Sequence, residues 1–329
     1  MSSPGHEPDR SAALVGILVL NYYHPVETLS CVRSLLEREP STTRIFWIEN
    51  DADRTSAGAF AVLEASGLPF QLLDPSTSAL PPEGVIGVLL NPENLGYAGG
   101  NNVGLRLLDR LAVPFAWVLN NDTRLVHGNS EALVEAARTR PEVGIWGTTI
   151  LAEHHGPSPE IVTYMGGILS LRDFSISLTA DPAVLESNPL SFVSGCSLFA
   201  ATGFLASLGF IPDTYFLYYE DPALTLEVRR RGFLASGVPA IQIDHLESLS
   251  TGRRSPLMEF YNRRNRWFFI QRYFPEELGA QKRGMAYRIQ KWVFRGRFDA
   301  IWVEYQAYQD FRKGLTGRTE RLFSRKPLR

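Results

Sequence analysis

The chain has 329 residues, of which 44% are hydrophobic and 21% are charged, values near the averages of folded globular proteins. This length predicts one large domain or two modest ones with a buried core, and the composition excludes fibrous, collagen-like and disulfide-stapled proteins. The net charge of −2 is the sum of two opposite charges, because residues 1–252 carry −14 and residues 253–329 carry +12. A basic, aromatic-rich segment after an acidic body indicates an anionic partner.

The remaining global signals concern compartment and membrane. Cys31 and Cys196 lie far apart and form no CxxC or Cys/His cluster, which suits a reducing cytosol and predicts neither a disulfide framework nor a thiolate metal site. The polar N-terminus does not resemble a signal peptide, so residues 1–11 are expected to be a disordered tail of a cytoplasmic protein. Residues 187–212 carry no charge, but their serines, glycines and prolines argue for a strand and a short helix rather than a membrane span.

The first half of the chain alternates apolar runs with helical spacing of apolar residues. Val15–Leu20 is a buried-strand run, and Pro25 opens a helix. The same alternation predicts strands over 44–48, 85–90 and 115–119 and helices over 101–111 and 130–140. It is typical of an α/β fold with a mainly parallel central sheet, in which chemistry gathers at the carboxyl ends of the strands.

The second half is expected to be less regular. Short β-like pieces around Ile145, 161–171 and 191–199 predict mixed or antiparallel pairing, followed by a helix after Asp221 and a strand over 233–243. Three helices are expected over 257–274, 279–294 and 298–311. We therefore expect one α/β domain over residues 12–252 and a basic, aromatic helical extension over 253–329 packed on it.

Polar residues follow three of the apolar strands. Asn21 and Glu49 each end a strand, and Asn121 and Asp122 follow a third. Because the strands are parallel, these side chains should share one edge of the sheet, where a carboxylate can bind a nucleobase, a ribose or a divalent cation. Taken singly, each residue is also of the type that forms loops and caps helices.

A glycine-rich stretch, residues 94–104, runs into a helix and contains Asn94, Gly96 and Asn101. Its backbone N–H groups and the helix N-terminus can face an anionic group, although an ordinary tight turn has the same composition. The stretch lacks the GK[ST] ending of a Walker loop, and no GxGxxG spacing follows the first strand. ATP and nicotinamide binding therefore receive little support.

Two further segments carry titratable groups. Glu220 and Asp221 follow a run of aromatic residues, which can restrict water and raise one carboxyl pKa toward working pH, as a general base requires. Capping of a helix by Asp221 is the alternative. His245 ends the last strand of the domain and, with Asp122, could form an oxygen and nitrogen shell for Mg²⁺ or Mn²⁺, although a lone histidine is usually structural.

In this order, the segments resemble family 2 glycosyltransferases of the GT-A fold, especially bacterial rhamnosyltransferase-like members. The likeness runs from about Val15 to Gly317. It rests on the joint spacing of five pieces, which are residues 94–104, 117–123, 194–204, 218–230 and 261–265. The resemblance implies a nucleotide-sugar-binding GT-A domain over 12–252 and transfer of a sugar from a nucleoside diphosphate with inversion at the anomeric carbon.

The resemblance also implies roles for residues at matching positions. Asp221 would be the base, with Glu220 beside it, and Asp122 and His245 would bind the metal. The donor site would contain Asn21, Glu49, Asn94, Gly96, Asn101, Asn121, Arg264 and Asn265, with Glu49 at the base and the Arg-Asn pair near the diphosphate. The sequence departs from the family pattern at Glu49, at the Asn-Asn-Asp metal motif, and at Ala223 and Glu227, which replace an Asp and an Arg.

We therefore expect a metal-dependent inverting glycosyltransferase of bacterial surface polysaccharide synthesis, with rhamnose favoured, a dTDP- or UDP-linked donor and a glycan or lipid-linked acceptor. A galactofuranosyltransferase and a non-catalytic sugar-nucleotide or glycan-binding member are alternatives. An NAD-dependent oxidoreductase has only the α/β alternation behind it. The interleaved cations and aromatics of residues 263–272 suit contact with an anionic membrane at the inner face of the cell membrane, or simple packing; nucleic acid is not the expected partner.

Overall fold

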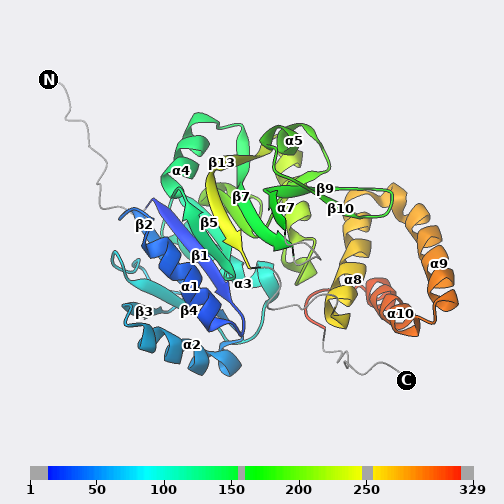
Figure 1. Cartoon of the computed structure of the whole chain (residues 1–329), viewed down its shortest axis with the longest axis horizontal. Coiled ribbons are helices and arrows are strands. Elements are labelled where there is room, and N and C mark those ends of the chain that lie inside the picture. Colours follow the sequence, from blue (N-terminus) through cyan, green and yellow to red (C-terminus); the bar gives the residue numbers. More distant parts are fainter. Residues whose placement is uncertain (1–13, 155–159, 247–254, 320–329) are drawn as a thin grey trace.

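The computed structural model describes residues 14–154, 160–246 and 255–319. Its centre is a ten-stranded sheet in the order β3-β4-β2-β1-β5-β12-β7-β13-β6, with β8 paired to β7 (Figure 1). The strands are β1 (Val15–Asn21), β2 (Thr43–Asn50), β3 (Phe70–Leu73), β4 (Ile86–Asn91), β5 (Phe115–Asn120), β6 (Thr123–His127), β7 (Val143–His154), β8 (Glu160–Tyr164), β12 (Ser197–Ala201) and β13 (Leu234–His245). Strands β3, β4, β2, β1 and β5 are parallel, and β12 is antiparallel to both neighbours.

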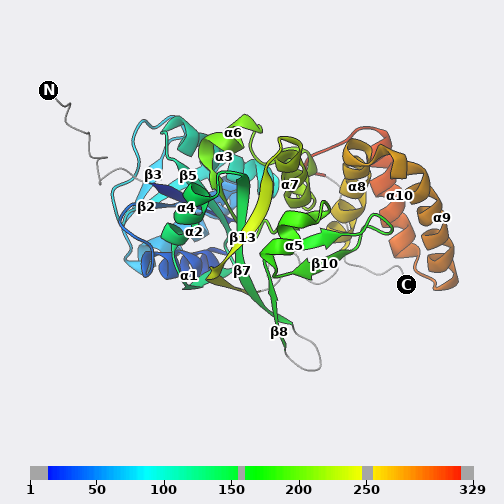
Figure 2. The same cartoon turned by 90° about the horizontal axis from the view of Figure 1, so that it is seen from above.

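Helices cover both faces of this sheet (Figure 2). One face carries α1 (Pro25–Leu36), α2 (Ala52–Ser66) and α4 (Ser130–Thr139), and the other carries α3 (Gly96–Arg110), α6 (Thr202–Ser207) and α7 (Glu220–Arg230). A smaller sheet, β10-β9-β11, is formed by β9 (Gly166–Leu169), β10 (Ile176–Thr179) and β11 (Ser191–Val193), with α5 (Pro182–Ser187) beside it.

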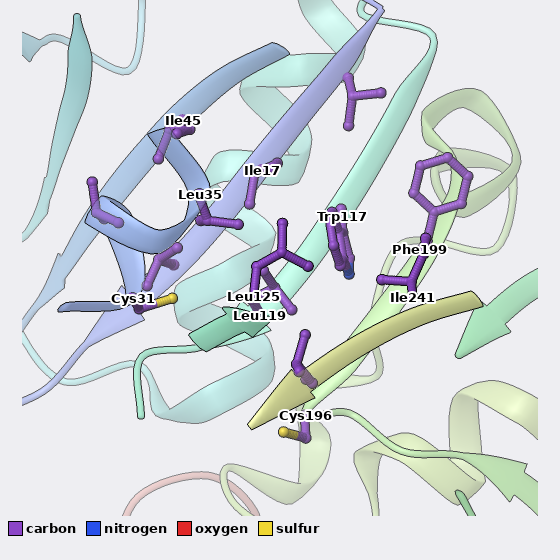
Figure 3. Packing of buried hydrophobic residues seen from close by; sticks show 14 of the residues in the cluster. Ile17, Cys31, Leu35, Ile45, Trp117, Leu119, Leu125, Cys196, Phe199 and Ile241 are labelled. Atoms are coloured by element: carbon purple, nitrogen blue, oxygen red, sulfur yellow. The ribbon is translucent and has the colours of Figure 1, made fainter. Parts of the chain in front are cut away.

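Alternation of side chains along β1 divides the core into two layers. Ile17 faces the layer that includes α1, and Leu18 faces the layer that includes α3. Figure 3 shows part of the first layer, where Trp117 of β5 lies among residues of α1 and β12. On the other face α3 lies very close to β1, because a Cβ at Gly16 would lie only 2.4 Å from Leu108 of α3. This packing fixes the helix that carries the glycine-rich stretch.

The C-terminal helices are α8 (Pro256–Tyr273), α9 (Leu278–Phe294) and α10 (Phe298–Arg312), and they lie together at one end of the molecule (Figures 1 and 2). Helix α8 joins them to the body, because Phe269 contacts Tyr219 with a ring-centroid distance of 5.2 Å and Tyr261 stacks on Phe216 at 5.1 Å. The expected boundary at 252–253 and the expected tail of residues 1–11 lie outside the described residues.

The packing favours one of the two interpretations of α8, in which its aromatic residues pack on the body. Trp267 and Phe269, which the sequence offered to a membrane surface, are fully buried, and Arg264 is 1% exposed. On this helix the aromatic residues pack against the body and against α10, because Trp267 also contacts Tyr308 and Phe311. Across the part of the chain that the structure describes, no helix is both long and apolar enough to cross a bilayer.

Several elements were not expected from the sequence, among them α2, β3, β6, β10 and α5. Helix α2 contains Gly58 and several polar residues, so its apolar spacing is weak, and the residue before it, Asp51, has a left-handed backbone (φ 84°). Strands β3 and β6 are four and five residues long, short enough for their pattern to be lost among turn residues.

Candidate active site

A cavity of about 1070 Å³ lies at the carboxyl ends of the central strands. Seven of the twelve predicted site residues line it: Asn94, Gly96, Asn121, Asp122, Glu220, Asp221 and His245. Further lining comes from the ends of β1 and β2, from residues 194–196 and 216–218, and from the start of α8. The three residues to which we assigned the metal and the base therefore share one cavity, although they lie as much as 123 positions apart in the sequence.

Asp122 and His245 face each other across this cavity. His245 Nε2 lies 3.3 Å from Asp122 Oδ1, and His245 Nδ1 lies 3.2 Å from the Tyr164 hydroxyl. The antiparallel pairing of β13 with β6 sets His245 opposite Thr123, the residue after Asp122. Burial alone would lower the pKa of His245, but the acidic groups of Cys196 and Asp122 outweigh it and raise the pKa to about 11.

This pair fits a partial shell for a divalent cation. Asp122 Oδ1 is buried and has no aligned hydrogen-bond partner among the described residues, so the contact with His245 is an ion pair only. Carboxylate oxygen and imidazole nitrogen suit Mg²⁺ or Mn²⁺, which keep open positions for phosphate oxygens. Within residues 14–154, 160–246 and 255–319 there is no cluster of three or more such ligands, so the pair is the part of such a shell that these residues show.

Glu220 and Asp221 open α7 inside the cavity. The Gly195 N–H donates to Asp221 Oδ2 at 3.4 Å, and the Glu220 Oε2 atom is buried without a partner in the described part of the chain. Burial raises the pKa of both carboxyl groups, and the charge of Asp221 adds to the rise for Glu220. The cavity thus contains a carboxyl pair that holds protons above the ordinary acidic range.

The loop before α7 has an unusual backbone. Phe216, Tyr218 and Tyr219 all have positive φ angles of 67°, 69° and 80°, which are unfavourable for large side chains. Asn265 of α8 stabilises this loop, because its Nδ2 group contacts the carbonyls of Tyr215 (2.7 Å), Leu217 (2.7 Å) and Tyr218 (3.1 Å). The loop contributes Phe216, Leu217 and Tyr218 to the cavity wall.

Five predicted site residues lie behind the cavity wall rather than in it: Asn21, Glu49, Asn101, Arg264 and Asn265. The Glu49 carboxylate is fully buried and accepts hydrogen bonds from Asn21 Nδ2 (2.7 Å), Trp47 Nε1 (2.9 Å) and Thr55 Oγ1. These donors hold it inside β2, so the direct contact with a nucleobase that the sequence suggested is not made from this conformation.

The other four also act on the cavity indirectly. Asn21 Oδ1 accepts from the lining residue Asn121 at 3.4 Å. Asn101 Nδ2 donates to the carbonyl of Tyr97, one turn earlier in α3, at 3.0 Å. Arg264 donates to the carbonyl of Tyr215 (3.2 Å) and so joins Asn265 in supporting the loop before α7. Their side chains are buried, which makes them residues that position the wall.

No family model matches the sequence. Two curated proteins, the N-acetylglucosaminyl-diphospho-decaprenol L-rhamnosyltransferases of Mycobacterium tuberculosis strains CDC 1551 and H37Rv, are each 25% identical to it over 179 residues. The match covers 49% of this chain, and the chain spans 58% of the length of these relatives. This is a distant homology over half of the chain.

Solved structures extend the likeness to nearly the whole chain. A mannosyltransferase, PcManGT from Pyrobaculum calidifontis with GDP-Man and Mn²⁺, covers 93% of this chain and 86% of its own, with a TM-score of 0.50 and 12% identity. TarS of S. aureus with UDP-GlcNAc covers 92% and 81%, with a TM-score of 0.51 and 13% identity. The chain has the GT-A glycosyltransferase fold. GalNAc-T7 with UDP, GalNAc and Mn²⁺ covers 78% of this GT-A chain and 48% of its own, with a TM-score of 0.54 and 14% identity.

Some residues that line the GT-A cavity were not predicted from the sequence. Asn50 lines it and joins β2 to the glycine-rich turn, because its Nδ2 donates to Asn94 Oδ1 at 2.9 Å and its Oδ1 accepts from Leu95 N at 3.0 Å. Tyr97 donates from its hydroxyl to the carbonyl of Gly195, the residue whose N–H contacts Asp221. Asn50 directly follows Glu49, so the strand-end argument could have included it; Tyr97 has no comparable signal.

The departures at Ala223 and Glu227 have a structural account in this GT-A chain. Ala223 is fully buried beneath α8. The Glu227 carboxylate accepts from Arg272 Nη2 (2.8 Å) and from the Tyr273 hydroxyl (2.8 Å), both on α8. Burial opposes the charge of Glu227, but these two donors outweigh it and lower the pKa. Both residues therefore serve the packing of α7 on α8.

Gly96 is the glycine of the GT-A site that a side chain would disturb most. It has φ +76°, and a Cβ there would lie 2.2 Å from the carbonyl oxygen of Phe216, which accepts a hydrogen bond from Tyr97 N at 2.9 Å. We expect Gly96→Ala to lower the free energy of unfolding by about 2 kcal/mol or more, from the left-handed backbone and the displaced loop. Chemical denaturation measures this free energy.

Gly203→Ala is the control. Gly203 lies in helix α6, and a Cβ there would have no neighbouring atom within 4 Å, so the substitution should be neutral or slightly stabilising. An equal effect of both substitutions would contradict the argument.

Proposed function

We propose that this chain is an inverting glycosyltransferase that moves a sugar from a nucleoside diphosphate donor to an acceptor hydroxyl. The observation that carries the proposal is the meeting of Asp122, His245 and Asp221 in one cavity of a GT-A fold. Inverting displacement at the anomeric carbon requires a base for the attacking hydroxyl and stabilisation of the departing diphosphate. The cavity contains candidates for both requirements.

In this proposal each group has one task. Asp221 accepts the proton of the acceptor hydroxyl while the acceptor oxygen bonds to the anomeric carbon and the bond to the diphosphate breaks. The pKa of Asp221 is raised by burial, which makes the carboxylate a better proton acceptor than an exposed aspartate. Asp122 and His245 would hold Mg²⁺ or Mn²⁺, which when bound neutralises the charge of the departing diphosphate.

The finer assignments rest on the distant relatives. The M. tuberculosis proteins are named as L-rhamnosyltransferases acting on N-acetylglucosaminyl-diphospho-decaprenol, which favours rhamnose as the sugar and a lipid-linked acceptor in bacterial surface polysaccharide synthesis. The donor would be linked to dTDP or UDP. Transfer of galactofuranose is the nearest alternative. The thiols of Cys31 and Cys196 are both buried, and we propose that the protein works in the reducing cytoplasm.

Two other functions have less support. The nicotinamide hypothesis rested on strand and helix alternation alone, which the GT-A fold accounts for. A non-catalytic binding member was suggested by Ala223, Glu227 and the Asn-Asn-Asp metal motif; Ala223 and Glu227 have packing roles in the structure, and Mn²⁺ binding tests the motif.

A panel of nucleotide sugars tests the proposal. With Mn²⁺ and a lipid-linked or soluble glycan acceptor, we expect release of a nucleoside diphosphate from a dTDP- or UDP-linked sugar and a product with inverted configuration by NMR. Release of no nucleoside diphosphate from any donor would overturn the proposal. Calorimetric binding of nucleotide that does not depend on metal and is unchanged by Asp221→Asn would favour a binding protein instead.

A further inference from the structure

The hairpin of α9 and α10 has a face that the other described residues do not cover. In α9, a helix of 17 residues, the buried side chain is Gln281. Phe294, at its end, is 90% exposed, and Phe298, at the start of α10, is more than half exposed. Phe294 is among the most apolar side chains of the molecule and yet one of the least covered, so this position is unfavourable in water without a partner.

The exposed apolar side chains follow the helical repeat. On α9, Tyr287 and Phe294 lie seven residues, or two turns, apart and therefore on one face. On α10, Phe298, Trp302 and Tyr305 have the same i, i+4, i+7 spacing, and all are more than half exposed. The turn over 295–297 joins the two stripes where they end and begin. We call these five residues the aromatic stripe.

The opposite face of α10 shows that the stripe is not an incompletely formed core. Ala300, Val303 and Ala307 of that helix are buried, and Val303 and Ala307 belong to an apolar cluster with Phe260 and Tyr261 of α8. Helix α10 is therefore already anchored through its inner side. The stripe is a second set of apolar side chains, which the described residues leave more than half exposed.

The charges around the stripe are mainly positive. Residues 278–298 contain six cations and no Asp or Glu. Arg288 contacts Glu304 and Arg297 contacts Asp299, but for the exposed Lys282, Arg283, Lys291 and Arg295 the described residues provide no carboxylate partner. Aromatic side chains flanked by unpaired cations are typical of surfaces that lie in the interface of an anionic bilayer.

We propose that the α9–α10 hairpin docks on an anionic lipid surface, with the aromatic stripe in the interface and the unpaired cations on the lipid headgroups. The charge pattern decides against a second copy of the chain, because a symmetric contact through this face would bring the same cations together. Figures 1 and 2 both show the hairpin at the end of the molecule farthest from β3 and β4, where a flat surface can approach it. The surface differs from the one that the sequence suggested on α8, whose aromatic residues are buried.

Vesicle binding by the full chain tests this proposal. The probes are vesicles of phosphatidylcholine alone and of phosphatidylcholine mixed with phosphatidylglycerol, with no donor or acceptor present. We expect flotation with the mixed vesicles, weaker binding at high salt, and little binding to the neutral ones. Equal binding to both kinds of vesicle, or to neither, would overturn it.

Variants locate the surface. Phe294→Ser with Trp302→Ser, and separately Lys291→Glu with Arg295→Glu, should each lower the partition coefficient by about tenfold or more. Leu72→Ser on β3 and Arg138→Glu on α4 are matched controls, since both residues are exposed and lie elsewhere; they should bind as the parent does. Unchanged binding by the stripe variants contradicts the proposal, as does a dimer in analytical ultracentrifugation that these variants abolish, or preferred binding of nucleic acid.

The outcome is independent of the proposed transferase activity. The stripe variants should keep the parent's melting temperature and its rate on a soluble acceptor, because the stripe does not line the cavity. Loss of vesicle binding with retained transfer supports the docking surface alone. Vesicle binding by a protein that transfers no sugar would support the surface and contradict the transferase proposal.

Discussion

Asp221→Asn should lower the rate of sugar transfer by about 10²- to 10⁴-fold, the range over which a positioned general base contributes. The substitution preserves the shape of the side chain and removes its ability to accept the proton of the acceptor hydroxyl. Steady-state release of nucleoside diphosphate measures the loss. Asp213→Asn is the matched control, because Asp213 is exposed in the preceding turn and does not line the cavity.

The raised pKa of Asp221 also predicts how activity and stability depend on pH. Burial raises the pKa of Asp221, so the base is protonated and inactive at low pH, and kcat/KM should rise with pH through the raised pKa. The free energy of unfolding should change in the opposite direction and fall as pH rises. A carboxyl whose folded pKa exceeds its unfolded value near 4 stabilises the fold least once it is ionised, so stability falls as pH rises between the two values. In the Asp221→Asn variant the free energy of unfolding should fall less over this pH range, because the titrating carboxyl is gone. A kcat/KM that stays constant down to pH about 4 would contradict the assignment of Asp221 as the base.

Asp122→Asn should abolish Mn²⁺ binding and lower transfer by about 100-fold or more, since charge stabilisation by a bound cation is worth several kcal/mol. His245→Ala should act in the same direction. The electron paramagnetic resonance signal of free Mn²⁺ measures binding directly, with no turnover needed. The control is Asp244→Asn, because Asp244 precedes His245 but does not line the cavity.

The two readouts together decide the role of the pair. Reduced Mn²⁺ binding with reduced transfer supports a metal site at Asp122 and His245. Full Mn²⁺ binding by both variants would place the cation elsewhere and leave the pair as a partly buried ion pair that supports the wall.

The parts of the fold that the sequence predicted well are those with strong local signals. The pattern of apolar residues alone identifies the strands β1 and β5 and the helix that begins at Pro25. Helix α2 was missed because its burial depends on contacts with β2 and β4 that its own pattern does not reveal. The same limit explains β6, which exists through pairing with β13.

The candidate site was predicted unevenly for a similar reason. Residue type and position at a strand end were enough to bring Asp122 and His245 into one cavity. They could not distinguish a side chain that points into the cavity from one that points into the sheet, as Glu49 does, because that depends on donors such as Trp47 and Thr55. Asn265 likewise has a role that only tertiary structure assigns, since its three carbonyl partners belong to a loop nearly fifty positions earlier.

The hydrogen bonds from Asn265 to the loop before α7 limit which segments could be exchanged between related proteins. Leu257, Met258 and Tyr261 of the same helix form part of the cavity wall. The C-terminal helices are thus structurally continuous with the cavity wall. A chimera that takes the α/β body from one protein and these helices from another would have to carry residues 215–219 and α8 across together, because separating them would remove the hydrogen bonds that hold this wall.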